Sequence, residues 1–158
     1  MGVSGVGKTT IAEALAERLG WTFKEGDDLH PAANIAKMKA GHPLTDADRE
    51  PWLDAIAAWI DARLADGESG VITCSALKRA YRDRLDRGRP RVRFVFVQLS
   101  EAAVAKRIGA RKGHFMPPSL LASQFADLEP PAPDEPVIVD DASQPVSAQV
   151  DAVIAALH

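Results

Sequence analysis

The hydrophobic residues of this chain follow two alternating patterns. In the first, apolar side chains recur every three or four positions, which predicts helices over residues 11–20, 31–41 and 45–67. In the second, β-branched and aromatic residues form short runs, which predicts strands at residues 21–23, 71–75, 92–99 and 137–140. Because strands and helices alternate with few hairpin signals, we expect an α/β fold whose parallel sheet is covered on both faces. Ligands should then bind outside the carboxyl ends of the strands.

Two segments interrupt this alternation. Residues 110–119 combine positive charge, glycine and paired prolines, and residues 129–136 are acidic and rich in proline. Both compositions predict loops. The length of 158 residues and the hydrophobic fraction of 46% suit one compact core. We therefore expect a single domain over residues 1–158.

The chain opens with a glycine-rich motif that reads G-x-x-x-x-G-K-T from Gly2 to Thr9. Small residues let backbone N–H groups converge on phosphate oxygens, Lys8 supplies a charge for the β- and γ-phosphates, and the Thr9 hydroxyl can bind Mg²⁺. The loop leads into a predicted helix, whose N-terminus favours anions. The motif therefore predicts a site for ATP formed by Gly2, Val3, Ser4, Gly5, Val6, Gly7, Lys8, Thr9 and Thr10.

The strand that should lead into this loop is absent from the sequence. A phosphate-binding loop normally follows a buried apolar strand in the middle of the sheet, and only Met1 precedes Gly2. We therefore expect the first strand to be missing from this chain, with Met1 as its last residue. On this hypothesis the functional N-terminus lies upstream, and the sheet of this chain lacks a central strand.

Composition narrows the classes of partner and compartment. The net charge of −3 and the absence of a Lys/Arg block argue against broad binding to nucleic acid or anionic membranes. The single cysteine, Cys74, excludes an internal disulfide, and its apolar strand predicts a packing role. No apolar run reaches the length of a membrane span or a secretory signal. We expect a cytoplasmic protein with no nucleic-acid or membrane partner.

Polar residues that follow the strand at 21–23 are candidates for chemistry. Asp27 or Asp28 could accept a proton from a substrate hydroxyl or orient metal-bound water. The alternative is a solvated turn or helix-capping acid. His30, next to Pro31, could contact substrate or could fill a loop.

Basic residues gather in two later segments. Ser75, Lys78 and Arg82 are spaced by three and four positions, so one helix could present a hydroxyl and two cations to an anionic substrate. A solvent-facing basic helix is the alternative. Arg107 and Arg111 lead into a basic glycine-containing loop that could close over ATP during phosphoryl transfer, or could be an ordinary surface loop. No Asp ends the strand at 71–75, so the metal site should rely on Thr9, phosphate oxygens and Asp27.

Four sequence blocks match a known family. They are GVSGVGKTT, GDDLHPAANIAKMKAGHPLTDADREPWL, CSALKRAYRDRLDRG and RKGHFMPPSLLASQFADLEPP. With these blocks the sequence resembles the gluconokinase family, small kinases of the adenylate-kinase-like branch of phosphate-loop proteins, over nearly its whole length. The resemblance implies a three-layer P-loop NTPase fold in one kinase domain. Its parts would be a phosphate loop at 2–10, a substrate-binding helical region at 27–66 and a small lid at about 107–122.

The resemblance also implies an activity and a set of residues. The activity is ATP-dependent phosphorylation of D-gluconate at its 6-hydroxyl, with Mg²⁺, giving 6-phosphogluconate for the pentose phosphate or Entner–Doudoroff routes. Catalytic roles are implied for Lys8, Asp27 and Arg111. Substrate contacts are implied for Asp27, His30, Arg49, Lys78, Arg82 and His114, ATP contacts for the loop with Arg107 and Arg111, and a metal contact for Thr9.

Further details follow from the same resemblance. Residues 141–145 are similar to a loop that lines the adenine, and relatives are commonly homodimers. Glu25 stands where relatives often carry Asp, so a strict metal-ligand role is not expected there.

Other functions stay open at this point. A kinase of the same branch could act on shikimate or a nucleoside monophosphate, although the segments HPAANIAKM and PLTDADREPW favour gluconate. A regulatory module that binds ATP without catalysis is a second alternative. A GTPase-like switch is a third, and the later loops carry no GTP-type specificity tetrapeptide.

Overall fold

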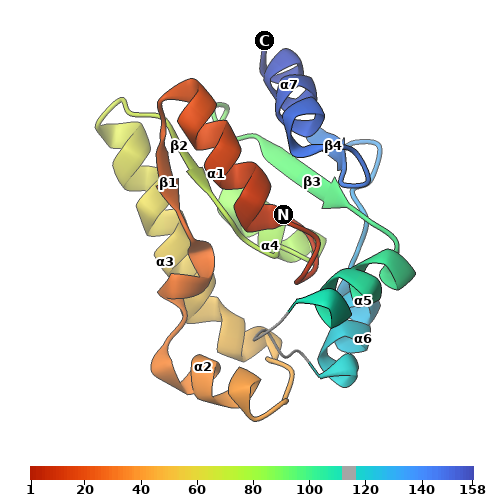
Figure 1. The fold of residues 1–158 in the computed structure, drawn as a ribbon. Coiled ribbons are helices and arrows are strands. Elements are labelled where there is room, and N and C mark those ends of the chain that lie inside the picture. Colours follow the sequence, from red (N-terminus) through yellow and green to blue (C-terminus); the bar gives the residue numbers. More distant parts are fainter. Residues whose placement is uncertain (112–116) are drawn as a thin grey trace.

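The computed structural model describes residues 1–111 and 117–158 (Figure 1). The first half of the chain forms α1 (Lys8–Leu19), β1 (Thr22–Lys24), the 3-10 helix η1 (Gly26–Leu29), α2 (Ala32–Lys39), α3 (Asp46–Ala65) and β2 (Gly70–Ile72). The second half forms α4 (Arg79–Asp86), β3 (Phe94–Gln98), α5 (Glu101–Ala110), α6 (Pro118–Asp127), β4 (Val137–Asp141) and α7 (Val146–Leu157).

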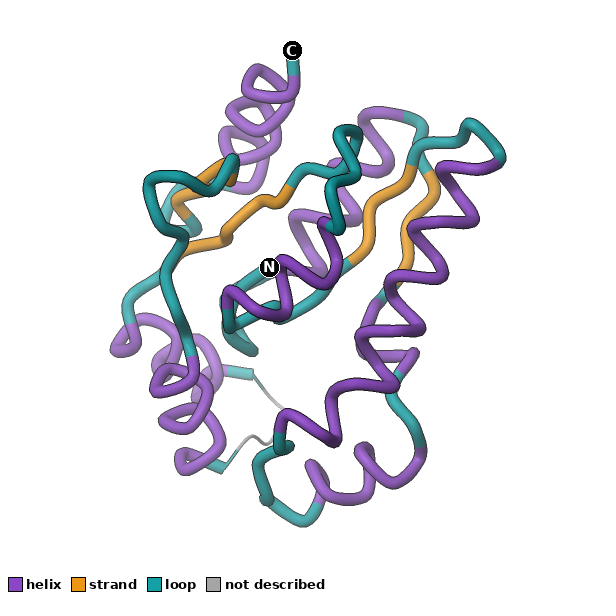
Figure 2. Tube along the Cα trace, turned by 180° about the vertical axis from the view of Figure 1, so that it is seen from behind, coloured by secondary structure: helices purple, strands orange, loops and turns teal. Residues whose placement is uncertain are grey.

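The strands form two parallel pairs. β1 pairs with β2, with Thr22 opposite Gly70, and β3 pairs with β4, with Phe94 opposite Val137. β2 and β3 are the inner strands, as the tube view shows from behind (Figure 2). Backbone hydrogen bonds of the first two residues link the pairs: Met1 bonds with Val95 and Val97 of β3, and the Gly2 N–H donates to Ser75 O after β2 at 3.0 Å.

Helices cover both faces of these strands, with a hydrophobic core on each face. One core joins α1, α5, α6 and α7, around Ile11, Val104 and Val153. The other joins α3 and α4 around Trp52, Ile56 and Leu85, with Met1, Ile72 and Phe94 packed against it. The expected α/β P-loop architecture, with helices on both faces of parallel strands, is therefore confirmed.

Local signals set several element boundaries. The Thr45 hydroxyl accepts from the Asp48 N–H and the Asp48 carboxylate accepts from the Thr45 N–H, so the expected capping box begins α3. Gly20 ends α1 in the left-handed conformation at φ 67°. Cys74 is buried as expected, and burial raises the pKa of its thiol to about 12.

Three boundaries differ from the sequence expectations. β2 stops at Ile72, short of the expected end at residue 75, and the Thr73 hydroxyl just after it accepts from the Gly26 N–H at 2.9 Å. α6 begins at Pro118, inside the segment expected to be a loop at 110–119, since proline suits the first turn of a helix. α4 begins only at Arg79, so Ser75 does not belong to the same helix as Arg82.

Within the described residues, none of the helices combines the length and apolarity that crossing a bilayer requires.

The buried amino group of Met1 makes stability depend on pH. Its pKa is lowered from 8.0 to about 5, first by burial and then by the charge of Lys8. The unfolded chain therefore binds this proton more tightly than the folded chain, and the free energy of unfolding should rise as pH increases from about 5 to about 8.

N-terminal acetylation isolates this effect from the other groups that titrate. Melting temperatures of the free and acetylated chains should be measured across that range. The acetylated chain should have the higher melting temperature at low pH, and the difference between the two chains should shrink toward pH 8. An advantage that stays constant with pH would contradict the burial of the amine.

Candidate active site

Glycines allow the backbone conformation of the phosphate loop. Gly5 and Gly7 have φ values of 81° and 106°, which side-chain-bearing residues rarely adopt. A Cβ on Gly5 would lie 2.7 Å from the Ile108 side chain of α5, so the loop also packs too closely there for a larger residue. Lys8 begins α1 directly behind these turns. The expected loop therefore forms, with its N–H groups at a helix N-terminus.

The Lys8 side chain turns back onto the phosphate loop. Its Nζ donates to Val3 O at 2.8 Å. Burial lowers the pKa of Lys8, and the negative charges of Asp27 and Glu25 oppose that shift.

Glu25 connects the phosphate loop to both strands of the first pair. Its Oε2 accepts from the Thr9 hydroxyl at 2.6 Å, and its Oε1 accepts from the Thr73 hydroxyl. Sequence reasoning assigned the acid beside Thr9 to Asp27 and gave Glu25 no firm role. The structure instead brings Glu25 to Thr9. Thr73 was not singled out, although a polar residue at the end of an apolar run was a usable signal.

Glu25 and Thr9 offer adjacent oxygen atoms, which are the donors that Mg²⁺ prefers. Among residues 1–111 and 117–158, no three His, Cys, Asp or Glu side chains gather into a protein-only metal site. Phosphate oxygens would therefore have to complete the coordination, and these two residues fit such a site.

The turn that carries Asp27 is fixed from both sides. The Trp52 indole N–H donates to Gly26 O at 2.8 Å, and the Gly26 N–H donates to Thr73. The Asp27 side chain keeps 71% of its surface exposed and lies 4.0 Å from His30 Nε2. The Asp27 carboxylate is therefore exposed to solvent, while hydrogen bonds of the neighbouring residue fix the backbone that carries it.

The His30 side chain is fixed in place beside the same turn. Its ring stacks on Trp52 with centroids 4.4 Å apart and planes 12° apart, and Nδ1 lies 3.3 Å from the Asn34 amide nitrogen. Burial lowers the pKa of His30, which favours the neutral ring at pH 7. His30 therefore lies beside Asp27 as expected, with its side chain 5% exposed.

Arg49 and Lys78 meet around Tyr81. Arg49 donates to the Tyr81 hydroxyl at 3.1 Å and lies 3.4 Å from the Asp127 carboxylate of α6. Lys78 donates to Asp46 at 2.9 Å, and the Tyr81 hydroxyl donates to the same carboxylate. These two hydrogen bonds lower the pKa of Asp46, Tyr81 contributing most. The structure therefore brings Arg49 and Lys78 together, through a tyrosine that sequence reasoning missed.

Arg82 does not face this cluster. It is 2% exposed and makes a two-pronged ion pair with Glu135, at 2.6 and 2.8 Å. It also donates to the carbonyls of Ala76, Leu77 and Glu129. The expectation that Lys78 and Arg82 point the same way from one helix is wrong, because Glu135 holds Arg82 in the interior.

Arg107 joins the phosphate loop to the segment after β4. Its guanidinium donates to Val6 O at 2.9 Å and to Ala142 O. Ala142 belongs to the 141–145 segment expected near the adenine, where the Asp141 carboxylate accepts from the Ser143 N–H at 2.9 Å. Arg107 therefore lies at the phosphate loop, as expected.

The lid residues can be placed only in part. Arg111 ends α5 with an exposed side chain. His114 and the middle of the expected lid at 107–122 lie outside the described residues. On α6, Gln124 accepts from the Ser4 N–H at 2.6 Å, which ties this helix to the phosphate loop. No sequence signal indicated that contact.

Comparisons with known proteins agree with this geometry. Residues 1–131 match the protein family described as "AAA domain". A gluconokinase of Gluconobacter oxydans is 55% identical over 138 residues, which cover 87% of this chain and 78% of that protein.

Two crystal structures are also similar. That of a gluconokinase from Sinorhizobium meliloti has a TM-score of 0.88 and 49% identity, over 99% of this chain and 88% of that one. That of a sugar kinase from Janibacter sp. HTCC2649 has a TM-score of 0.93 and 50% identity, over 99% and 91%.

The close approach at Gly26 predicts a strong effect of one methyl group. A Cβ there would lie 1.8 Å from Thr73 O, so Gly26→Ala must displace β2 from the turn. We expect the free energy of unfolding in urea to fall by about 1–3 kcal/mol or more.

Gly109→Ala in α5 is the matched control, because among the described residues no atom outside its own stretch of helix lies within 4 Å of its Cβ position. That change should leave stability equal or raise it by about 0.5–1 kcal/mol. Equal effects of the two substitutions would contradict the close packing at Gly26.

Proposed function

The chain belongs to the gluconokinase family, and we propose that it transfers the γ-phosphoryl group of ATP to the 6-hydroxyl of D-gluconate. One observation carries this proposal: Thr9 of the phosphate loop is hydrogen-bonded to Glu25, two residues before Asp27, in a chain 55% identical to a gluconokinase. The products are ADP and 6-phosphogluconate, which would enter the pentose phosphate or Entner–Doudoroff routes.

The nucleotide phosphates would occupy the loop from Gly2 to Thr10. Its backbone N–H groups and the dipole of α1 favour the anion, and Lys8 would exchange its bond to Val3 O for phosphate oxygens. Arg107, which bonds Val6 O and Ala142 O, would set the loop against the 141–145 segment near the adenine. Arg111 would add charge to the transferred group from the end of α5.

The acceptor hydroxyl would approach Asp27. This carboxylate is exposed and is carried by the hydrogen-bonded backbone of η1, which suits a group that receives the hydroxyl proton as the new P–O bond forms. His30, neutral and stacked on Trp52, would limit the positions available to the polyol. Positioning of this kind supplies much of the catalysis in phosphoryl transfer.

Arg49 and Lys78 would bind the carboxylate of gluconate. Each is already paired, Arg49 with Asp127 and Lys78 with Asp46, so the substrate would have to compete for them. The Lys78 pair is reachable, because Asp46 is 66% exposed and solvent-exposed pairs are weak. Arg82, buried against Glu135, would position the residues just before Lys78 instead. His114 remains a proposed substrate contact.

Mg²⁺ would be held by the Thr9 hydroxyl and the Glu25 carboxylate together with ATP. It would supply charge neutralisation for the phosphates. The Thr73 hydroxyl holds the second oxygen of Glu25, which would keep the carboxylate directed at Thr9.

Two wider features belong to the same proposal. We place the reaction in the cytoplasm. We also expect a homodimer, as the resemblance implies, and exposed apolar residues such as Trp21, Ile35 and Val146 would allow one.

The activity can be tested by ADP release with ATP and Mg²⁺. D-gluconate should stimulate turnover, whereas shikimate and nucleoside monophosphates should not, and GTP in place of ATP should give no gluconate-stimulated release of GDP. Lys8→Ala should abolish the signal, and chelation of Mg²⁺ should do the same. A preparation that binds ATP but shows no stimulation by gluconate would contradict the proposal and favour a regulatory module.

Asp27→Asn separates catalysis from binding. We expect kcat to fall by about two or more orders of magnitude, because the variant cannot accept the hydroxyl proton, while ATP affinity changes little. Asp28→Asn makes the same charge change at the adjacent exposed residue and should stay near normal. Steady-state kinetics and ATP titration measure both variants. A near-normal kcat for Asp27→Asn would remove this residue from the mechanism.

A further inference from the structure

The peptide group between Val3 and Ser4 in the phosphate loop is hydrogen-bonded on both sides. Its carbonyl, Val3 O, accepts from Lys8 Nζ at 2.8 Å, and its N–H, on Ser4, donates to the Gln124 side chain at 2.6 Å. None of the described peptide bonds is cis, and the C=O and N–H of a trans peptide point in opposite directions. Lys8 and Gln124 therefore contact one peptide of the loop from opposite sides.

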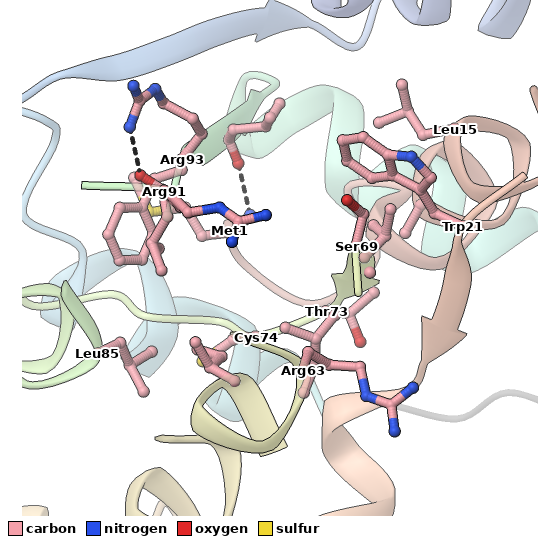
Figure 3. A pocket seen from close by; sticks show the side chains of 18 of the residues that line it. Met1, Leu15, Trp21, Arg63, Ser69, Thr73, Cys74, Leu85, Arg91 and Arg93 are labelled. Atoms are coloured by element: carbon pink, nitrogen blue, oxygen red, sulfur yellow. Dashed lines mark hydrogen bonds between the residues drawn. The ribbon is translucent and has the colours of Figure 1, made fainter. Parts of the chain in front are cut away.

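Lys8 approaches this peptide from the interior of the molecule. Its side chain lines an apolar pocket of about 530 Å³ between the strand pairs, together with Met1, Thr73 and Cys74 (Figure 3). Gln124 is not among the described residues that line this pocket. Its contact with Ser4 therefore lies on the other side of the loop.

The helix that carries Gln124 is fixed one turn before and one turn after this residue. Leu121 is 7% exposed and belongs to the hydrophobic core around α1, α5 and α7. Asp127 lies 3.4 Å from Arg49 in the acceptor half of the site. The position of Gln124 is thus set by contacts other than its own bond to Ser4. The side chain can therefore hold the loop in place instead of following its movements.

We infer that Gln124 is a positioning residue for ATP binding, which acts on Lys8 through the peptide between Val3 and Ser4. Its oxygen fixes the N–H of this peptide and so keeps Val3 O directed at Lys8 Nζ in the empty loop. When Lys8 exchanges Val3 O for phosphate oxygens, the peptide loses its inner partner, and Gln124 still holds its N–H.

The consequence is a phosphate loop that keeps one conformation before and after ATP binds. Such preorganisation lowers the entropy lost on binding, so it raises the affinity for ATP with little effect on the chemical step. The inference rests on the proposed function, because it concerns the same phosphate loop.

Two substitutions isolate the oxygen atom of Gln124. A backbone N–H can only donate, so the amide oxygen must face Ser4. Gln124→Met keeps a side chain of similar length without a strong acceptor, whereas Gln124→Glu keeps an oxygen that can accept the same bond. Ser123→Ala, at the neighbouring position of α6, controls for loss of a polar side chain from this helix.

We expect Gln124→Met to raise the Kd of ATP by about 10-fold, as suits the loss of one hydrogen bond that orders the loop. Calorimetry without gluconate measures this constant. Exchange of the Ser4 amide should become about 10-fold faster or more, since its acceptor is lost. The values of kcat and of KM for gluconate should change by less than about threefold.

The other variants should separate from Gln124→Met in the same measurements. Gln124→Glu should bring the Kd of ATP back to within about threefold of the native value, because the bond to Ser4 is kept. Ser123→Ala should match the native chain. Melting temperatures show whether each variant remains folded, which Leu121 in the core favours.

Three results would overturn the inference. One is an unchanged Kd of ATP in Gln124→Met while the Ser4 amide exchanges faster. Another is equal weakening by methionine and glutamate, which would show that the acceptor atom does not matter. The third is a loss of kcat with an unchanged Kd, which would indicate contact with the transferred group. Because ATP binding is measured without gluconate, failure here is distinct from failure of gluconate phosphorylation.

Discussion

The hydrogen bonds of Met1 and Gly2 are the constraint on which the rest of the active site depends. These two residues contact β3 on one side and the end of β2 on the other, and the phosphate loop begins immediately after them. These backbone bonds therefore help to set the position of Lys8 relative to the acidic turn at Glu25 and Asp27. The hydrogen bond from the Thr9 hydroxyl to Glu25 adds a side-chain contact between the nucleotide half of the site and the acceptor half.

The acceptor half is made rigid by packing behind it. Trp52 supports Gly26 through its indole N–H and His30 through ring stacking, while it is itself 1% exposed. The cluster of Arg49, Tyr81 and Lys78 is built differently, from ion pairs that a substrate carboxylate could replace. An acid on a fixed turn, such as Asp27, suits an enzyme whose base must keep one position. Cations whose ion pairs can be exchanged, such as Arg49 and Lys78, suit the binding of an anionic substrate.

Sequence reasoning succeeded where the determining interactions are local. The phosphate loop, the helix after it and the capping box of Thr45 and Asp48 each involve residues a few positions apart. It failed where the determinants are distant. Arg82 was assigned to the substrate because of its spacing from Lys78, yet Glu135, 53 positions later, decides where it points. Glu25 bonds both Thr9 and Thr73, which lies 48 positions away just after β2, and no single segment contains that information.

The pairing of Arg82 with Glu135 has a consequence for how such sequences can diverge. Both side chains are buried, at 2% and 8% exposure, so loss of either partner leaves an uncompensated charge in the interior, at a cost of about 3–5 kcal/mol. Two apolar residues of suitable volume could stand in their place, but the intermediate with one substitution would be poorly stable. The two positions, one in a helix and one in a proline-rich loop, are therefore expected to change together during evolution.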